Sequence, residues 1–302
     1  MSAEWAIELE HLSYRYGRAE AVHDLSLRVK PGRCYGLFGR NGAGKTTTIK
    51  CLLNLLRPSS GKVRVFGLDP TRDEVAVKSR LAYVPDQVAF YPWMTVRGAL
   101  DYLASFRPKW NQALERELVG QLRLEEDKKV GALSRGQRTQ LALAGAIAGM
   151  PELLVLDEPT SGLDPIVRRE FIQTVIGAYQ DADPGHRTVF VSTHLIDEFE
   201  GLIDELAIVD GGRLLLSIEA DEARARYRKI RARFSAEPPE LDLPGVLHAG
   251  RRGRELELTV NGQHDQVLQR LQALGPAALT TEALSLEEVF LVTAGRASGA
   301  AR

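Results

Sequence analysis

The residues with the clearest chemistry in this sequence occupy positions 39–46, which read GRNGAGKT. They match the phosphate-loop pattern G-x-x-x-x-G-K-[ST], whose glycines let successive backbone N–H groups turn inward around phosphate groups. In that pattern Lys45 can reach the terminal phosphates, and the hydroxyl of Thr46 is placed to bind Mg²⁺. The loop alone predicts a nucleotide site and leaves kinases, GTPases and motor ATPases open.

Two adjacent acids, Asp157 and Glu158, follow an apolar run at 153–156 that is expected to form a buried strand. We expect this strand to neighbour the strand that leads into the phosphate loop. Asp157 then lies near the Mg²⁺ ion, and Glu158 lies closer to the γ-phosphate, where a carboxylate can orient or deprotonate water. Phosphoryl transfer depends mainly on positioning and charge stabilisation. The two acids, Lys45 and Mg²⁺ together therefore supply most of the groups that this reaction needs.

The elements around the loop have the order that a phosphate-binding fold requires. An apolar strand is expected at 34–38, leading into the loop, and a helix is expected at 46–56, leaving it. Further strands are expected at 7–15, 22–29, 62–66 and 188–192, a hairpin at 206–218, and helices at 141–149 and 167–179. Residues 95–127 have a helical pattern and interrupt this alternation as a helical insertion.

Composition and charge exclude several classes of protein. The 302 residues are 44% hydrophobic and 26% charged, which suits one large domain with a smaller one. With 39 basic and 40 acidic residues, the bulk charge gives no indication of nucleic-acid binding. No uncharged apolar run reaches the roughly 18 residues of a membrane span. Cys34 and Cys51 have no disulfide or metal spacing and are expected to be buried.

A second motif, LSRGQ at 133–137, lies just before the acidic pair and opens a helix. Ser134 is a favourable N-cap, and the N-terminus of a helix attracts anions. The run resembles the signature motif of ATP-binding-cassette (ABC) ATPases, usually written LSGGQ, with Arg135 in place of the middle glycine. That position is tolerant in the family, so we expect Arg135 to adjust the activity of the signature motif without abolishing it. The resemblance covers roughly 5–217.

The resemblance assigns roles to further residues. The run SGLD at 161–164 resembles the D-loop, which crosses the seam between two subunits, and His194 matches the switch histidine that senses the γ-phosphate. Tyr16 matches the aromatic residue that stacks on adenine, with Tyr14 as the competing candidate. The implied catalytic residues are Glu158, His194 and Lys45, and the implied cofactors are ATP and Mg²⁺. The implied ATP-binding residues are Tyr16, Gly39, Asn41, Gly42, Ala43, Gly44, Lys45, Thr46 and Thr47 of one subunit and Ser134, Gly136 and Gln137 of the other.

One departure from the family pattern lies at 83–87, which read YVPDQ. Family members usually place Gln at the start of this Q-loop, which couples the nucleotide site to the helical insertion. Asp86 aligns with that Gln, and it can bind Mg²⁺ or water but adds negative charge beside phosphate. Gln87 could instead supply the amide through a shift of the loop. The implied metal ligands are therefore Thr46, Asp157 and either Asp86 or Gln87.

The fold implied by the resemblance is α/β, a P-loop NTPase core of the ABC type with an antiparallel β subdomain and a helical insertion. We expect the ATPase domain at 5–220, with its helical subdomain at about 88–150. A small C-terminal α/β domain is expected at 228–295, and a ferredoxin-like arrangement is one possibility for it.

The function implied by the resemblance is that of the ATP-hydrolysing subunit of an ABC transporter, which exports an unknown substrate through a separate integral membrane permease. Two subunits, identical or different, sandwich two ATP molecules. Likeness to bacterial exporter ATPases includes the run LEEVF at 286–290. The chain is then cytoplasmic and peripheral on the inner face of the cell membrane, without a nucleic-acid partner. The alternative is a soluble ABC ATPase of translation or DNA repair, although no second cassette, long coiled coil or zinc-binding insert is visible.

Overall fold

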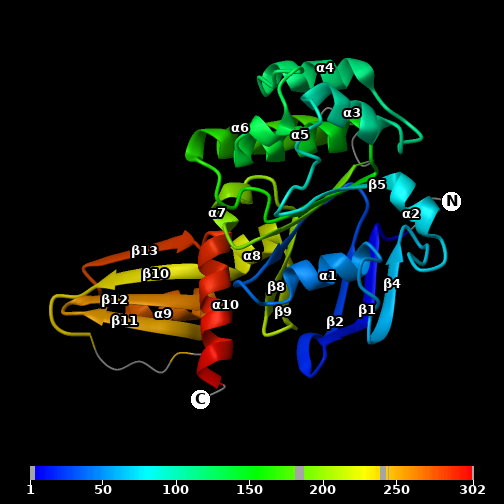
Figure 1. Cartoon of the computed structure of the whole chain (residues 1–302). Coiled ribbons are helices and arrows are strands. Elements are labelled where there is room, and N and C mark those ends of the chain that lie inside the picture. Colours follow the sequence, from blue (N-terminus) through cyan, green and yellow to red (C-terminus); the bar gives the residue numbers. More distant parts are fainter. Residues whose placement is uncertain (1–3, 181–186, 239–242, 244, 301–302) are drawn as a thin grey trace. The chain divides into compact units, whose positions relative to one another are not determined.

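The computed structural model describes residues 4–180, 187–238, 243 and 245–300 (Figure 1). The chain divides into two compact units, the first comprising Met1–His194 with Gly201–Ser217 and the second Leu195–Glu200 with Ile218–Arg302. The chain therefore enters the second unit twice, and its first entry begins directly after His194.

A six-stranded sheet in the first unit carries the phosphate loop, with strand order β5-β6-β7-β3-β8-β9. Its strands are β3 (Cys34–Phe38), β5 (Leu81–Val84), β6 (Leu153–Asp157), β7 (Thr188–Thr193), β8 (Glu205–Asp210) and β9 (Arg213–Glu219). Every pairing from β5 to β8 is parallel, and the short turn at Gly211 and Gly212 joins β8 to β9 as the expected hairpin. Every residue of β3, β6 and β7 is buried and most are apolar, because strands covered on both faces meet little water.

The prediction that β6 neighbours β3 is wrong, because β7 lies between them. Val155 on β6 is opposite Phe190 on β7, and Phe190 is in turn opposite Tyr35 on β3. Parallel strands are joined by long crossovers, so local sequence patterns do not reveal their order in space. All three strands nevertheless end at the same edge of the sheet, where the phosphate loop begins.

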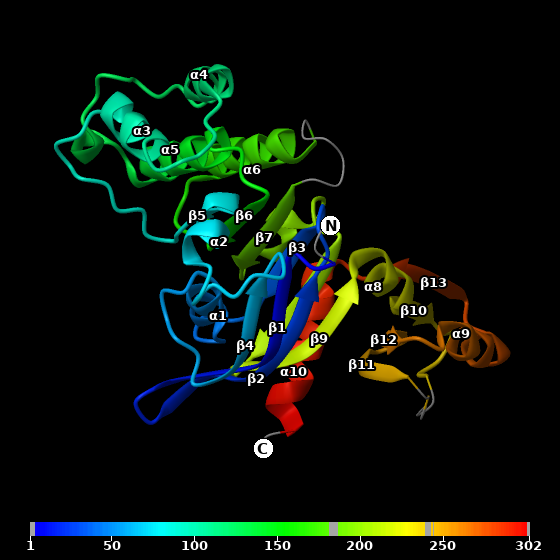
Figure 2. The same cartoon turned by 90° about the vertical axis from the view of Figure 1, so that its right-hand side faces the viewer.

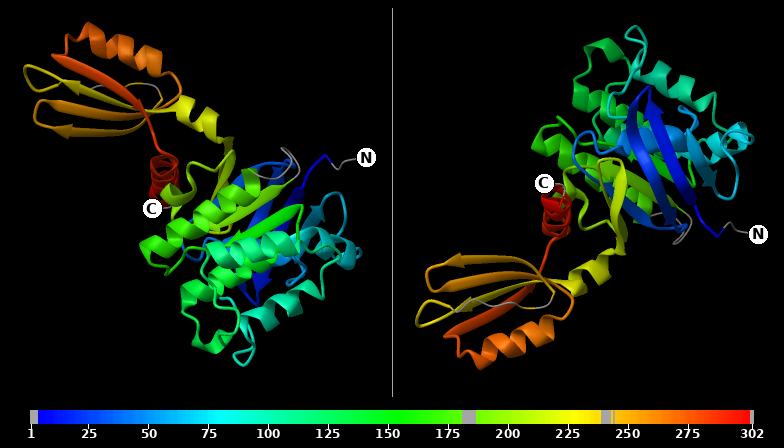
Figure 3. Two further views of the ribbon diagram at one scale, coloured as in Figure 1. Left: turned by 90° about the horizontal axis from the view of Figure 1, so that it is seen from above. Right: turned by 90° about the horizontal axis from the view of Figure 1, so that it is seen from below.

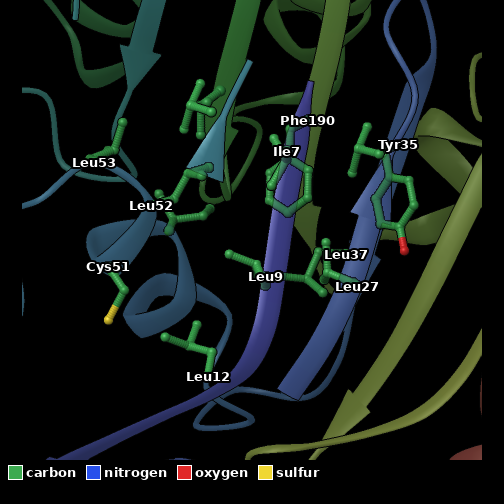
Figure 4. Close-up of a cluster of buried hydrophobic side chains, with 14 of the residues drawn as sticks. Ile7, Leu9, Leu12, Leu27, Tyr35, Leu37, Cys51, Leu52, Leu53 and Phe190 are labelled. Carbon is green, nitrogen blue, oxygen red and sulfur yellow. The ribbon is translucent and has the colours of Figure 1, made fainter. Parts of the chain in front are cut away.

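A three-stranded antiparallel sheet, with order β2-β1-β4, supports the loop from the other side of the core. It is formed by β1 (Ile7–Tyr16), β2 (Ala19–Val29) and β4 (Ser60–Val65). Ile7 and Leu9 point from β1 toward the region of Leu52 and Phe190 in the buried cluster of Figure 4. Cys34 and Cys51 are free and buried, as expected. This packing fixes α1 (Lys45–Leu52), the helix that follows the loop.

Four helices of the first unit, α3 (Val96–Ala104), α4 (Gln112–Gln121), α5 (Arg135–Ala148) and α6 (Pro165–Gln180), lie together at the top of Figures 1 and 2. The unit also contains η1 (Val130–Ala132) and α2 (Glu74–Arg80), which lies apart from this group and packs on β5. Thr95 and Asn111 cap α3 and α4, and Arg97 binds Glu115 through two hydrogen bonds of 2.6 and 2.9 Å that join these helices. No helix in the described part of the chain is long and apolar enough to cross a bilayer.

The second unit is built on an antiparallel four-stranded sheet of order β11-β12-β10-β13 (Figure 3). It contains α7 (Ile196–Phe199), α8 (Ala220–Arg226), β10 (Tyr227–Arg233), β11 (Val246–Arg252), β12 (Glu255–Asn261), α9 (His264–Ala273), β13 (Ala278–Ala283) and α10 (Leu286–Ala300). Val267 and Leu271 of α9 pack on Ile230 and Leu258. In the described residues, α9 connects β12 to β13 and no helix is found between β10 and β11, where a ferredoxin-like β-α-β-β-α-β motif has its first crossover helix, so the ferredoxin-like arrangement stays a prediction.

Candidate functional site

The phosphate loop is held so tightly that two of its positions accept only glycine. A Cβ atom on Gly44 would lie 2.4 Å from the carbonyl oxygen of Ala21, and one on Gly39 would lie 2.5 Å from that of Val209. Gly44 also has φ of +99°, in the left-handed region that favours glycine, and it caps α1. This conformation leaves backbone N–H groups at the start of α1 facing the space where an anion can bind.

At its other end, α1 stops at Leu52 and does not reach residue 56 as expected, because Asn54 adopts a left-handed conformation.

Lys45 is buried within this loop, with only 4% of its side chain exposed. Its Nζ atom donates to the carbonyl oxygens of Gly39 at 2.7 Å and Arg40 at 3.2 Å, and it lies 2.8 Å from Oε1 of Glu158. A buried ammonium needs such partners, because burial without them carries a large desolvation cost. Phosphate oxygens entering the loop can take over the contacts that the carbonyl groups now make.

Asp157 ends β6 as a buried acceptor of hydrogen bonds. Its Oδ1 atom accepts from the hydroxyl groups of Ser192 at 2.5 Å and Thr46 at 3.1 Å. Burial raises the pKa of the Asp157 carboxyl, and the hydrogen bonds from Ser192 and Thr46 partly oppose that rise. Sequence reasoning missed Ser192, although a serine at the end of an apolar strand was a visible signal. Hydroxyl and carboxylate oxygens of this kind are the ligands that Mg²⁺ prefers.

Glu158 lies between two of the other residues that sequence reasoning selected. Its Oε2 atom is 2.7 Å from Nδ1 of His194 and accepts the backbone N–H of His194 at 3.3 Å, while Oε1 pairs with Lys45. Its φ of +46° is left-handed for a residue with a side chain, which costs roughly 1–3 kcal/mol, and its backbone N–H is held by the carbonyl of Ser192 at 2.9 Å. The fold thus brings Lys45, Glu158 and His194 together from three separate parts of the chain.

The signature segment begins α5 with a capping box. Ser134 Oγ accepts the backbone N–H of Gln137 at 3.1 Å, and Gln137 Oε1 accepts the backbone N–H of Ser134 at 3.1 Å. The expected N-cap is confirmed. A Cβ atom on Gly136 would lie 3.0 Å from Cγ1 of Val167 on α6, so a larger residue there would require the Val167 side chain to shift. Within the described residues, no hydrogen bond or ion pair joins this segment to the phosphate loop.

The Q-loop and D-loop both lie near the start of α5. Asp86 Oδ1 accepts a hydrogen bond of 2.9 Å from Arg135 Nη2, and the charge of Asp86 contributes to the raised pKa of Asp157. Gln87 is exposed, and no hydrogen bond of its side chain is found among the described residues. In the D-loop, Asp164 caps α6 by accepting the backbone N–H groups of the second and third residues after it, each at 3.1 Å.

The other expected nucleotide contacts differ in exposure. The rings of Tyr14 and Tyr16 meet edge to face at 4.8 Å; Tyr14 packs on the core, whereas half of Tyr16 is exposed. Asn41 and Gly42 are exposed at the tip of the phosphate loop, while Ala43 and Thr47 are buried beneath it. Among the described residues, no group of three or more His, Cys, Asp or Glu side chains could hold a metal ion by itself.

Comparison with known proteins places these features in a family context. A family model described as ABC transporter matches residues 22–161. The bacitracin transport ATP-binding protein BcrA of Bacillus licheniformis is 38% identical over 226 residues, which cover 74% of this chain and 72% of that protein. The daunorubicin/doxorubicin resistance ATP-binding protein DrrA of Streptomyces peucetius is 32% identical over 310 residues, which cover 96% of this chain and 92% of that protein.

Solved structures give the same fold. A structure described as the ATP binding subunit of an ABC transporter matches with a TM-score of 0.66 and 24% identity, covering 73% of this chain and 92% of that one. The cbiO1 protein of Clostridium perfringens, described as part of the ABC transporter complex cbiONQ, matches with a TM-score of 0.61 and 25% identity, covering 74% of this chain and 91% of that one. The expected α/β core with an antiparallel subdomain is confirmed.

Proposed function

Because this chain belongs to the ABC transporter family, we propose that it is the ATP-hydrolysing subunit that drives export through a separate membrane permease. The chain is an ATP-binding ABC ATPase. The proposal of export rests on one observation. The chain is similar over nearly its whole length, both units included, to proteins whose names refer to drug resistance and export. These include DrrA and the Nod factor export ATP-binding protein I of Neorhizobium galegae, which is 32% identical over 96% of this chain.

We assign the chemistry of hydrolysis to Glu158 and to the two residues that its carboxylate contacts, Lys45 and His194. Lys45 stabilises negative charge on the terminal phosphates, and the Glu158 carboxylate accepts a proton from the attacking water. The water oxygen bonds to the γ-phosphorus while the bond to the bridging oxygen of ADP breaks, which yields ADP and phosphate. His194, at 2.7 Å from Glu158, holds that carboxylate in position and can contact the γ-phosphate.

The same edge of the sheet fits a magnesium ion. Thr46 and Asp157 present oxygen atoms 3.1 Å apart, and a partly phosphate-bound Mg²⁺ uses one or two such ligands. When bound, Mg²⁺ neutralises charge that develops on the phosphates. We assign the Q-loop role to Asp86 because its charge reaches Asp157, whereas Gln87 is exposed and makes no described contact.

A complete site requires a second subunit. The signature segment opens α5 with an exposed Ser134, and in the described residues it shares no hydrogen bond with the phosphate loop; we propose that Ser134, Gly136 and Gln137 complete the site of a partner subunit. The exposed N-terminus of α5, a helix of fourteen residues, supplies backbone N–H groups and a favourable dipole for the partner's γ-phosphate. Each subunit in turn completes the other's site, so hydrolysis depends on dimerisation.

The surface that fits a permease lies on the first unit beside α3. Four exposed aromatic rings form a continuous row, Tyr91 on Trp93 at 4.6 Å, Tyr91 to Tyr102 at 6.4 Å and Tyr102 to Phe106 at 5.0 Å. Phe106 also lines an apolar groove of about 820 Å³, which Leu55, Val75 and Leu103 share. Exposed apolar surface of this extent marks a protein contact, and an amphipathic helix of the permease could bury its apolar face in such a groove.

The experiment is affinity purification of the tagged protein from membranes extracted with mild detergent. We expect a polytopic membrane protein to copurify with the wild type and to be lost from Val75→Asp/Phe106→Asp, which places charges in the groove while leaving ATP binding intact. Leu274→Asp, a similar change at an exposed leucine of the second unit, is the matched control and retains the partner. Recovery of ribosomes or DNA without a membrane protein would contradict the proposal and favour a translation or repair ATPase.

A further inference from the structure

Two residues that depart from the family pattern contact each other in this structure. Asp86 stands where the family usually has Gln, and Arg135 stands at the middle glycine of the signature motif. They are 49 positions apart in sequence, yet Arg135 Nη2 donates to Asp86 Oδ1 at 2.9 Å. One residue lies in the loop after β5 and the other is the first residue of α5. Because the contact joins two segments far apart in the chain, it ties the position of the loop after β5 to the start of α5.

The D-loop contributes a third component to this contact. A Cβ atom on Gly162 would lie 2.7 Å from Nη1 and 3.2 Å from Cζ of Arg135, so the guanidinium occupies the space that a side chain would need. Gly162 also has φ of +68°, which favours glycine. The Arg135 side chain thus touches the Q-loop, begins the signature helix and lies against the D-loop.

The charges explain why the two departures belong together. Asp86 adds a negative charge to the end of the sheet where Asp157 and Glu158 already lie, and Arg135 supplies the matching cation. Arg135 alone would leave an uncompensated cation at the exposed start of a helix, where the dipole disfavours positive charge. The side chains of the pair are 51% and 38% exposed, so their attraction adds little to the stability of the fold. Its effect must therefore be sought in the relative placement of the three loops.

We propose that Asp86 and Arg135 act as one positioning unit, an ion-pair latch that ties the Q-loop to the signature helix and the D-loop of the same subunit. The latch links the half-site that binds ATP in a chain to the half-site that the same chain presents to its partner. This inference rests on the proposed dimeric ATPase function and adds to it a pair of residues that acts through placement, without touching the reacting atoms.

A double-mutant cycle tests the latch, using the wild type, Asp86→Gln, Arg135→Gly and the double variant, which carries both usual family residues. We expect each single change to reduce kcat about three- to tenfold and to weaken ATP-driven dimerisation by a similar factor. The double variant is expected to return to within about twofold of wild type, because neither charge is then left without its partner. Dimerisation is measured by light scattering in a Glu158→Gln background, which separates assembly from turnover.

Two controls separate placement from folding. The melting temperature of the subunit is expected to change little in any member of the cycle, whereas a merely structural pair would show its coupling there. Glu125→Gln and Lys128→Gln remove another exposed ion pair of the helical region, at 3.2 Å, and are expected to leave kcat unchanged. Arg135→Gln, which keeps the side-chain stem, replaces Arg135→Gly if glycine at the start of α5 lowers the yield of folded protein.

The latch predicts a salt dependence as well. High salt is expected to move the kcat of the wild type toward that of the single variants, while the double variant changes less, because exposed charges are screened. If the losses in the single variants multiply in the double variant, with no coupling between them, the latch is refuted while the ATPase function stands. If the wild type shows neither ATP-driven dimerisation nor hydrolysis, the proposed function itself fails.

Discussion

The phosphate-loop half of the site and the signature half are built in opposite ways. Lys45 and Asp157 are almost fully buried, at 4% and 1% exposure, and strands from the core fix their partners. Ser134 and Arg135 of the signature segment are exposed, and the side-chain hydrogen bonds described for the segment are those of its own capping box and of the half-exposed Arg135–Asp86 pair. One half is therefore prepared by the core of a single chain, and the other depends on local capping and on the partner that meets it.

The largest effect is expected from Glu158→Gln in the buried half. Removing the carboxylate should lower kcat by about 10²–10⁴, the range for general acid–base catalysis, while the loop still binds ATP. The ATP-bound dimer should then persist, which gel filtration detects while phosphate release reports turnover. Glu152→Gln, which changes an exposed acid just before β6, serves as the control and should hydrolyse ATP normally. Normal turnover in Glu158→Gln would disprove the assignment of the water-activating residue.

A smaller effect, on binding instead of turnover, is expected from Lys45→Ala. The change removes charge-assisted contacts to phosphate worth about 1.5–3 kcal/mol, so the Kd for ATP should rise roughly 10- to 100-fold. Calorimetric titration of the isolated subunit measures this directly. Lys50→Ala, on the same helix α1, is the control and should bind ATP as the wild type does. Unchanged affinity for ATP in Lys45→Ala would show that this lysine does not contact the phosphates.

The smallest effect is expected from Ser134→Ala in the exposed half. Loss of the cap should reduce the free energy of unfolding by about 1 kcal/mol, and Ser134→Thr should retain most of it. Denaturant titration measures the loss. ATP binding by the single subunit should stay unchanged while ATP-driven dimerisation weakens. A loss of ATP binding comparable to that of Lys45→Ala would show that the two halves are not separate within one chain.

The same contrast explains how much the sequence could predict. The phosphate loop, the apolar run before Asp157 and the Ser134 cap are local features, in which spacing and residue type determine the conformation. The position of β7 between β6 and β3 depends on crossovers that local patterns do not encode.

Local sequence patterns also failed to predict two short elements of the fold and one contact of the site. Helix α2 and strand β5 went unnoticed because α2 buries only Val77 and β5 has four residues. The contact of Asp86 with Arg135 joins two loops that are far apart in the chain. Ser192 is different: it could have been selected, since it is a polar residue at the end of a strand that leads to His194.

The short segment Leu195–Glu200 has a consequence for dissecting the protein into fragments. It follows His194 directly, but it belongs to the second unit. Its Ile196 and Phe199 are fully buried, and α7 packs on α10. The carbonyl oxygen of Glu200, just after α7, accepts a hydrogen bond from Arg224 of α8. The backbone N–H of Leu286 is bound by the Glu200 carboxylate at 3.0 Å. A fragment that stops at Ser217 would thus expose two large apolar side chains immediately after the switch histidine. Because the second unit takes one of its segments from inside the first, no single cut in the chain separates the two units.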